Sequence, residues 1–258
     1  GSDLKFVNNT SRLREYVAFN TNNFLLPTSL GKIANQDLHA IAPTDYVIIT
    51  VQSILPQAQR LAQFHQTKNN LRTAVVTTDQ VYNEFSSGIA DPTAMRDFVK
   101  MLFDRNVANP ANQPKYLLLL GDASFDYKDR LRNNTNLVPA WQNDNSLDPL
   151  FTYTSDDCFG FLNDNEDINS TALINQLDIG IGRIPARNIN DAKNYIDKIE
   201  AYYKKESYGP WRNNQLFIAD DEDFNVHLQD VEVITSTVET TNPVFNPAKI
   251  YLDAFRQE

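Results

Sequence analysis

Carboxylates that follow or interrupt apolar segments are the residues of this chain best suited to chemistry. Asp122 follows the apolar run 116–120, and a carboxylate at the end of a buried strand can bind a metal, orient a base or cap a loop. Asp156 and Asp157 are adjacent and flanked by aromatic residues, where a partly buried carboxylate could receive a cationic side chain. The alternative in both places is a turn in which the carboxylate bonds only nearby backbone amides.

The only cysteine, Cys158, is a poor candidate for a nucleophile. A nucleophilic cysteine needs a nearby base and a lowered pKa, whereas the adjacent Asp157 would raise the pKa of this thiol. A buried structural cysteine is therefore the better interpretation. The histidines, which are far apart in sequence and have no zinc-site spacing to cysteine, are His39, His65 and His227.

Two acidic stretches, residues 163–167 and 220–223, are dense in oxygen ligands and could hold Ca²⁺. Neither has the spacing of an EF-hand loop, and solvated acidic loops are the more common outcome. The sequence also has no glycine-rich nucleotide motif of the GxGxxG or Walker A type. We therefore expect no organic cofactor and keep calcium as the one candidate ion.

Composition limits the partners. The chain has 258 residues and a formal net charge of −10, and no Lys/Arg cluster offsets that charge locally. An acidic surface repels nucleic acid and anionic lipid. No stretch approaches the ~20 apolar residues that would span a bilayer. Hydrophobic residues make up 41% of the chain, which is enough to fill a core.

Along the chain, short runs of β-branched or apolar residues alternate with segments whose apolar residues have helical spacing. These strands and helices must position the candidate residues. This alternation predicts an α/β fold with a mostly parallel sheet and helices on both faces. In such sheets chemistry collects at the carboxyl ends of the strands, which is where Asp122 lies. We expect strands at 45–51, 72–77, 116–120, 177–185, 216–219 and 249–252, and helices at 56–68, 79–85, 91–102, 190–205 and 227–240.

Two regions lack this alternation. Residues 3–41 are polar and irregular, which is typical of a linker or of a segment that packs on a preceding domain. The long stretch 123–177 is rich in Asn, Asp, Ser and Pro, and a loop of that length is usually functional or partly disordered. Gly209 and Pro210 then break the chain at a candidate subdomain boundary.

Several segments, in their order and spacing, resemble the gingipain family of cysteine peptidases. The resemblance rests on the segments KYLLLLGD at 115–122, YTSDDCFG at 153–160 and LDIGIGRIP at 177–185, and on the helix that begins near Asp191. Residues 24–28 and 83–88 are similar to one branch of that family, the peptidase that removes C-terminal sorting domains in the type IX secretion system, often called its sortase.

The resemblance implies a caspase-like α/β/α sandwich made of two subdomains. We expect an N-terminal extension over 1–41, a first subdomain over 42–208 and the start of a truncated second, catalytic subdomain over 209–258. The His and Cys of the family dyad would lie beyond this chain's end, so we expect the chain itself to be inactive and its parent to be a cysteine endopeptidase. By position, Asp156 matches the acid that lies in the specificity pocket of arginine-specific gingipains.

We therefore expect Asp156, Asp157 and Asp122 to contribute to substrate binding. Cys158 stands where the family has an aromatic residue, a departure that separates this chain from the arginine-specific pattern. The resemblance also implies a protein or peptide substrate, secretion-system components as partners, and a location outside the cell or on the outer-membrane surface. The alternatives are a non-catalytic binding or assembly module of a cell-surface protein, and a nucleotide-binding α/β domain that rests on topology alone.

Overall fold

The computed structural model describes residues 5–9, 11–19, 24, 26–29, 31–143, 145, 147–148, 150–168, 175–220 and 223–256. The chain divides into two units, Gly1–Gln36 and Asp37–Glu258. The described residues of the first unit contain no helix or strand, in keeping with their irregular sequence. All the elements below belong to the second unit.

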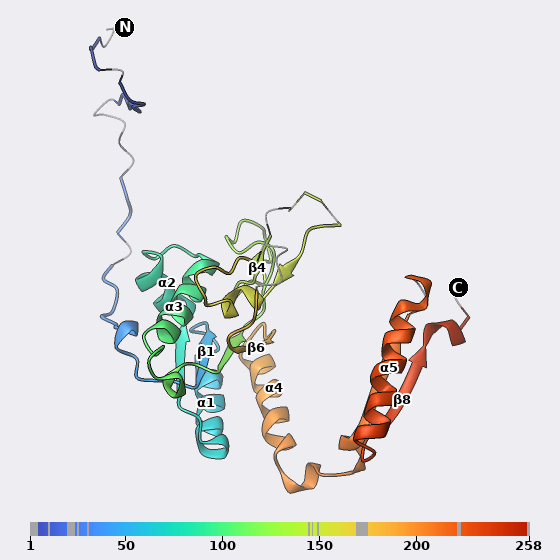
Figure 1. The fold of residues 1–258 in the computed structure, drawn as a ribbon. Helices are drawn as coiled ribbons and strands as arrows, with labels where there is room; N and C mark the ends of the chain where they lie inside the picture. Colours follow the sequence, from blue (N-terminus) through green and yellow to red (C-terminus); the bar gives the residue numbers. More distant parts are fainter. Residues whose placement is uncertain are drawn as a thin grey trace. The chain divides into compact units, whose positions relative to one another are not determined.

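A four-stranded parallel sheet forms the centre of that unit (Figure 1). Its inner strands are built from apolar residues, and Val47, Ile48 and Ile49 are completely buried because both faces of the sheet are covered. The four strands expected to share one parallel sheet do so, which confirms the prediction. In spatial order they are β2 (Thr73–Thr77), β1 (Tyr46–Thr50), β3 (Tyr116–Leu120) and β6 (Gly180–Ile184).

The helices begin at the signals that the sequence contains. The Asp91 side chain accepts a hydrogen bond from the amide of Thr93 at 2.9 Å, and Pro92 occupies the first turn, as predicted. Thr77 and Gln80 form a reciprocal capping box at the next helix upstream. The helices are α1 (Leu55–Asn69), α2 (Thr78–Phe85), α3 (Pro92–Asp104), α4 (Ile189–Tyr202) and α5 (Val226–Thr241).

Two hydrophobic cores lie on the two faces of the sheet. Leu117 and Leu119 pack with the apolar stripe of α3, in which Phe98 is fully buried. The alternate strand residues, such as Leu118, face the opposite way and pack with residues of α1 and α4, such as Ile196. The sheet is thus covered by α2 and α3 on one face and by α1 and α4 on the other (Figure 1), which confirms the expected sandwich.

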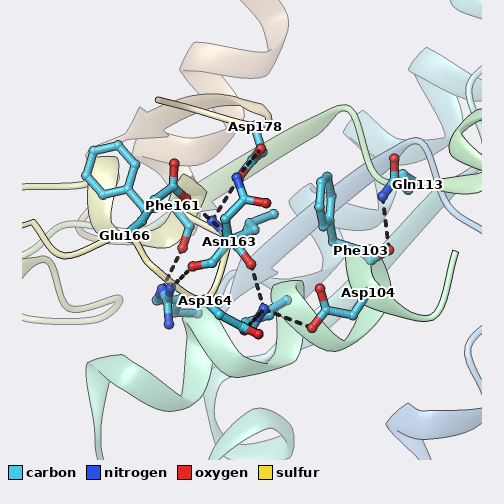
Figure 2. Close-up of polar contacts among 11 residues, drawn as sticks. Phe103, Asp104, Gln113, Phe161, Asn163, Asp164, Glu166 and Asp178 are labelled. Atoms are coloured by element: carbon cyan, nitrogen blue, oxygen red, sulfur yellow. Dashed lines mark hydrogen bonds and ion pairs between the residues drawn. The ribbon is translucent and has the colours of Figure 1, made fainter. Parts of the chain in front are cut away.

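The long connection between β3 and β6 contains two short strands, β4 (Trp141–Gln142) and β5 (Thr154–Ser155), which pair antiparallel. These strands could not be predicted, because two residues are too few to show a β-strand alternation. Residues 161–164 are tied to α3: Arg96 donates to the carbonyl of Phe161 at 2.7 Å, and Lys100 forms an ion pair with Asp164 at 2.9 Å. Figure 2 shows Asn163 beside Asp178, to which its side chain donates at 3.1 Å.

A second, two-stranded parallel sheet contains β7 (Asn214–Ala219) and β8 (Asn246–Tyr251). α5 contacts both strands. Its Glu232 forms an ion pair with Lys249 of β8 at 3.0 Å. Both strands and the helix were expected, although each strand begins two or three residues earlier than predicted. No helix in the described parts of the chain is both long and apolar enough to cross a membrane.

Candidate functional site

The turn after β3 brings three chain segments together at the carboxyl edge of the four-stranded sheet. The amide of Gly121 donates to the carbonyl of Ile184 at the end of β6 at 3.0 Å, and the carbonyl of Asp122 accepts from the amide of Val138 at 3.0 Å. A Cβ atom at residue 121 would lie 2.7 Å from a methyl group of Val138. Glycine is needed at this position because a side chain here would overlap with the side chains of Leu137 and Val138.

Arg183 of β6 is the centre of this edge. Its Nε and Nη2 donate to the two carboxylate oxygens of Asp156, each at 2.7 Å. The remaining N–H groups donate to the carbonyls of Gly121 at 2.9 Å, Val138 at 2.7 Å and Pro139 at 3.2 Å. All five N–H donors of the guanidinium are therefore used, in a position where the side chain is only 14% exposed.

The Asp156 carboxylate is consequently held inside the edge and does not stand on an isolated loop tip. Its side chain is 23% exposed, and both oxygens face Arg183. Asp157 differs, because it is exposed and its amide donates to the Ser155 hydroxyl at 3.0 Å. Among the described residues, none forms a hydrogen bond or ion pair with the Asp157 carboxylate. Of the two adjacent acids, Asp157 is the one with an uncommitted charge.

Asp122 lies at the same edge but has a different partner. Its side chain is 14% exposed and forms an ion pair at 3.0 Å with Nε of Arg187, which is itself 68% exposed. The two residues line a hollow of about 420 Å³ at the start of α4, where Asp191 accepts from the amide of Arg187 at 3.1 Å. Arg187 and Asp157 are thus exposed charges of opposite sign at this edge.

Cys158 is buried, as the sequence analysis expected. Burial raises the pKa of its thiol to about 11, and no histidine is among the groups that influence it. The raised pKa agrees with the prediction, but its main cause is burial; Arg96 lowers the pKa, Asp167 and Asp97 raise it, and Asp157 is not among the groups that act on it. A thiol in this state is a weak nucleophile at neutral pH.

We predict that Cys158 in the folded chain reacts with iodoacetamide at pH 8 at least about a hundredfold more slowly than in the urea-unfolded chain. A pKa near 11 instead of 9 lowers the thiolate fraction by that factor, and burial restricts access further. Mass spectrometry of quenched samples measures both rates. Equal rates in the native and unfolded chains would contradict the buried position.

The carboxylates of the first acidic stretch have partners within the protein. Asp164 pairs with Lys100, and Glu166 accepts from the amides of Asn163 at 2.9 Å and Gln176 at 3.0 Å. Asp178, Asp164 and Glu166 surround Asn163 in Figure 2. In the second stretch, Asp221 and Glu222 lie outside the described residues. Calcium binding at either stretch stays a prediction.

One other group in the described parts offers three ligand atoms within 4.8 Å of one another, namely Asp37, His39 and Glu84. Glu84 already accepts from the amide of Leu38 at 2.8 Å and contacts Nδ1 of His39 at 2.8 Å. The imidazole stacks on Phe85 with ring centroids 5.0 Å apart. These contacts attach residues 37–40 to α2, which accounts for the cluster structurally.

Comparison with known proteins places the fold. The sequence model of peptidase family C25 matches residues 39–258. The crystal structure of dimeric latent PorU from Porphyromonas gingivalis has a TM-score of 0.60 and 35% identity, and the match covers 71% of this chain and 18% of PorU. The crystal structure of the Arg-specific cysteine proteinase gingipain R has a TM-score of 0.56 and 19% identity, covering 84% of this chain and 43% of that one. None of the curated proteins matches the chain.

Proposed function

This chain belongs to peptidase family C25, and we propose that it forms the substrate-facing first part of a cysteine endopeptidase while carrying no catalytic nucleophile of its own. The observation that supports the proposal is the carboxyl edge of the sheet. There the exposed charges of Asp157 and Arg187 lie beside the Arg183–Asp156 pair. Cys158, the only cysteine, supports the proposal that the chain carries no catalytic nucleophile, because a buried thiol with a pKa near 11 cannot serve as the family nucleophile. We propose a first subdomain over 42–208, a second beginning at 209, and an extension over 1–41.

Within the edge we assign different tasks to the three acids. Asp157 receives a cationic group of the substrate, because its carboxylate is exposed and uncommitted. Asp122 contributes through its pair with Arg187, which can in turn meet a substrate carbonyl or carboxylate. Asp156 acts as a positioning residue, since a cationic substrate would have to share a carboxylate that Arg183 already binds through both oxygens.

The biological setting is part of the proposal. The resemblance of residues 24–28 and 83–88 to the type IX branch, together with the 35% identity to latent PorU, supports a role in processing secreted proteins outside the cell or at its outer surface. The alternative function is a peptide-binding or assembly module that never cleaves. The buried state of Cys158 is the observation that favours this alternative.

The purified 258-residue chain is expected to hydrolyse no fluorogenic peptide with Arg, Lys or a neutral residue before the reporter. It should also remain unlabelled by an acyloxymethyl ketone directed at cysteine peptidases, because Cys158 is neither accessible nor ionised. Turnover is measured by fluorescence and labelling by intact mass. Activity that disappears in Cys158→Ala would overturn the proposal.

The proposed role of Asp157 in substrate binding is tested with a peptide that contains a single arginine. The comparison is the same peptide with citrulline in place of that arginine. Replacing Asp157 with Asn should weaken binding of the arginine peptide by roughly tenfold to a hundredfold, the usual contribution of one charge-assisted pair. Binding of the citrulline peptide should change little. Fluorescence anisotropy measures both.

Asp253→Asn serves as the matched control, because it removes one exposed charge elsewhere in the same unit. If Asp157→Asn and Asp253→Asn have the same effect, only net charge matters and Asp157 is not part of a binding site. Equal affinities of both peptides for the unmodified chain would also exclude recognition of a cation.

A further inference from the structure

A hollow of about 620 Å³ lies on the α1–α4 face of the sheet, towards the amino ends of the strands. It is therefore at the end of the sheet opposite the carboxyl-edge acids. Its floor follows from the strand register. Tyr46, Tyr116 and Gly180 are neighbours in one row across the sheet, and the next row of this face continues from Leu118 to Gly182.

On β6, both rows end in a glycine, Gly180 in the first row and Gly182 in the second. A Cβ atom added at Gly182 would have no atom within 4 Å, so the space above it is open. The following row ends in Ile184, which packs into the core with α1 and α4 and closes that end. The hollow is open above Gly182, whereas the ring of Tyr116 covers Gly180, with one ring carbon 3.2 Å from the position of an added Cβ atom.

Aromatic side chains form the walls. Tyr46 meets His65 of α1 edge to face, with ring centroids 5.2 Å apart, and Tyr116 in the same manner at 6.3 Å. Tyr203, which follows α4, lines the hollow and contacts Phe64 at 5.1 Å. The backbone of Gly182 forms an open part of the floor, and aromatic rings form the sides. The hollow therefore suits a planar group.

The polar groups around the hollow belong to tyrosine, histidine and asparagine side chains and to the backbone. Its lining contains no Asp, Glu, Lys or Arg. Nδ1 of His65 is engaged by Asn69 at 2.9 Å. Burial raises the pKa of Tyr46, so its hydroxyl keeps its proton, and no described residue forms a hydrogen bond with it. A partly buried ring whose hydroxyl has no partner among the described residues can orient a ligand that has one hydrogen-bonding group.

We propose that this hollow, defined by Tyr46, His65, Tyr116, Gly180, Gly182 and Tyr203, binds a small neutral molecule with a planar aromatic ring. The size of the hollow is within the range of ligand pockets, and its mixture of rings with a few neutral polar groups is typical of them. The described lining residues offer no carboxylate, ammonium or guanidinium group that could form an ion pair with a ligand, in contrast to the opposite edge of the sheet.

Indole is the probe for the test, with the full 258-residue chain and amide NMR as the readout. The chain has only eight glycines, so the amide signals of Gly180 and Gly182 can be followed in an uncrowded region. We expect saturable shifts of these two signals with a dissociation constant of about 1 mM, the strength typical of a fragment of this size. Cyclohexanol, which is non-planar but has one hydroxyl, should bind at least about tenfold more weakly.

Gly182→Val is the matched variant, because valine suits a strand and its side chain enters the open space. Its unfolding midpoint should equal or exceed that of the unmodified chain, while indole affinity should fall by roughly tenfold or more. If Gly182→Val does not fold, Tyr203→Ala, which removes one exposed wall, should weaken indole binding in its place. The proposal is overturned if indole leaves the Gly180 and Gly182 signals unchanged, if the folded variants bind it as well as the unmodified chain, or if cyclohexanol binds equally.

Discussion

Replacing Arg183 with alanine is expected to lower the free energy of unfolding by about 3–5 kcal/mol, the usual loss when one partner of a buried ion pair is removed. The substitution leaves the Asp156 carboxylate, 23% exposed, without its cation. It also leaves the carbonyls of Gly121, Val138 and Pro139 without a donor. Urea unfolding followed by circular dichroism measures the change, which corresponds to a midpoint temperature lower by roughly 10 °C.

Arg187→Ala is the control for this prediction. Arg187 lies at the same edge and also pairs with an aspartate, but it is 68% exposed. Exposed pairs contribute at most about 1 kcal/mol, so this variant should unfold nearly as the unmodified chain does. Arg183→Lys should fall between the two, since a lysine cannot reproduce the five-donor geometry. If the two alanine variants lose equal stability, Arg183 is not the centre of the edge.

Phe159→Ala is expected to be comparably damaging, with a loss of about 3–5 kcal/mol. Phe159 follows directly after the Asp156–Cys158 segment, is completely buried, and belongs to the core that contains Phe98 of α3. Truncating it removes a ring from a packed interior and leaves a cavity beneath the acidic edge. The loss is measured by denaturant unfolding with tryptophan fluorescence.

Phe125→Ala provides the comparison, because Phe125 is on the same long connection but 69% exposed. Its removal should change stability by less than about 0.5 kcal/mol. A loss below about 1 kcal/mol for Phe159→Ala would mean that the connection is not anchored by this ring, and the positions of Asp156 and Asp157 would then need another explanation.

The strands and helices could be predicted because local rules and the tertiary structure agree. Four of the five residues at 46–50 are β-branched, and the last four are buried. Asp91 with Pro92 marks a helix start without help from distant residues. The position of Asp122 at the carboxyl edge followed from the direction of β3, because parallel topology fixes which end of a strand carries the next loop.

The arrangement at the edge could not be predicted, because it depends on contacts between residues far apart in sequence. Arg183 and Asp156 are separated by 27 positions, and nothing in either segment identifies the other. Their pairing changes the role assigned to Asp156 while leaving Asp157 free, a distinction that two adjacent identical residues cannot show. The position of both β6 glycines on one face of the sheet follows from the strand register, which the sequence of β6 alone does not show.

The dependence of the edge on Arg183 also has a consequence for how the chain acquires its shape during synthesis. The ribosome produces the turn at Gly121 and the acid at 156 before it reaches the arginine that binds both, and 27 residues take about 1–5 s to translate. β6 is also the last of the four strands to emerge, and it can pair only with a β3 that is already in place. A nascent chain halted before residue 183 would therefore have no partner for the Asp156 carboxylate, although Arg96 and Lys100 could already hold residues 161–164 on α3. The carboxyl edge would be completed late, when Arg183 docks.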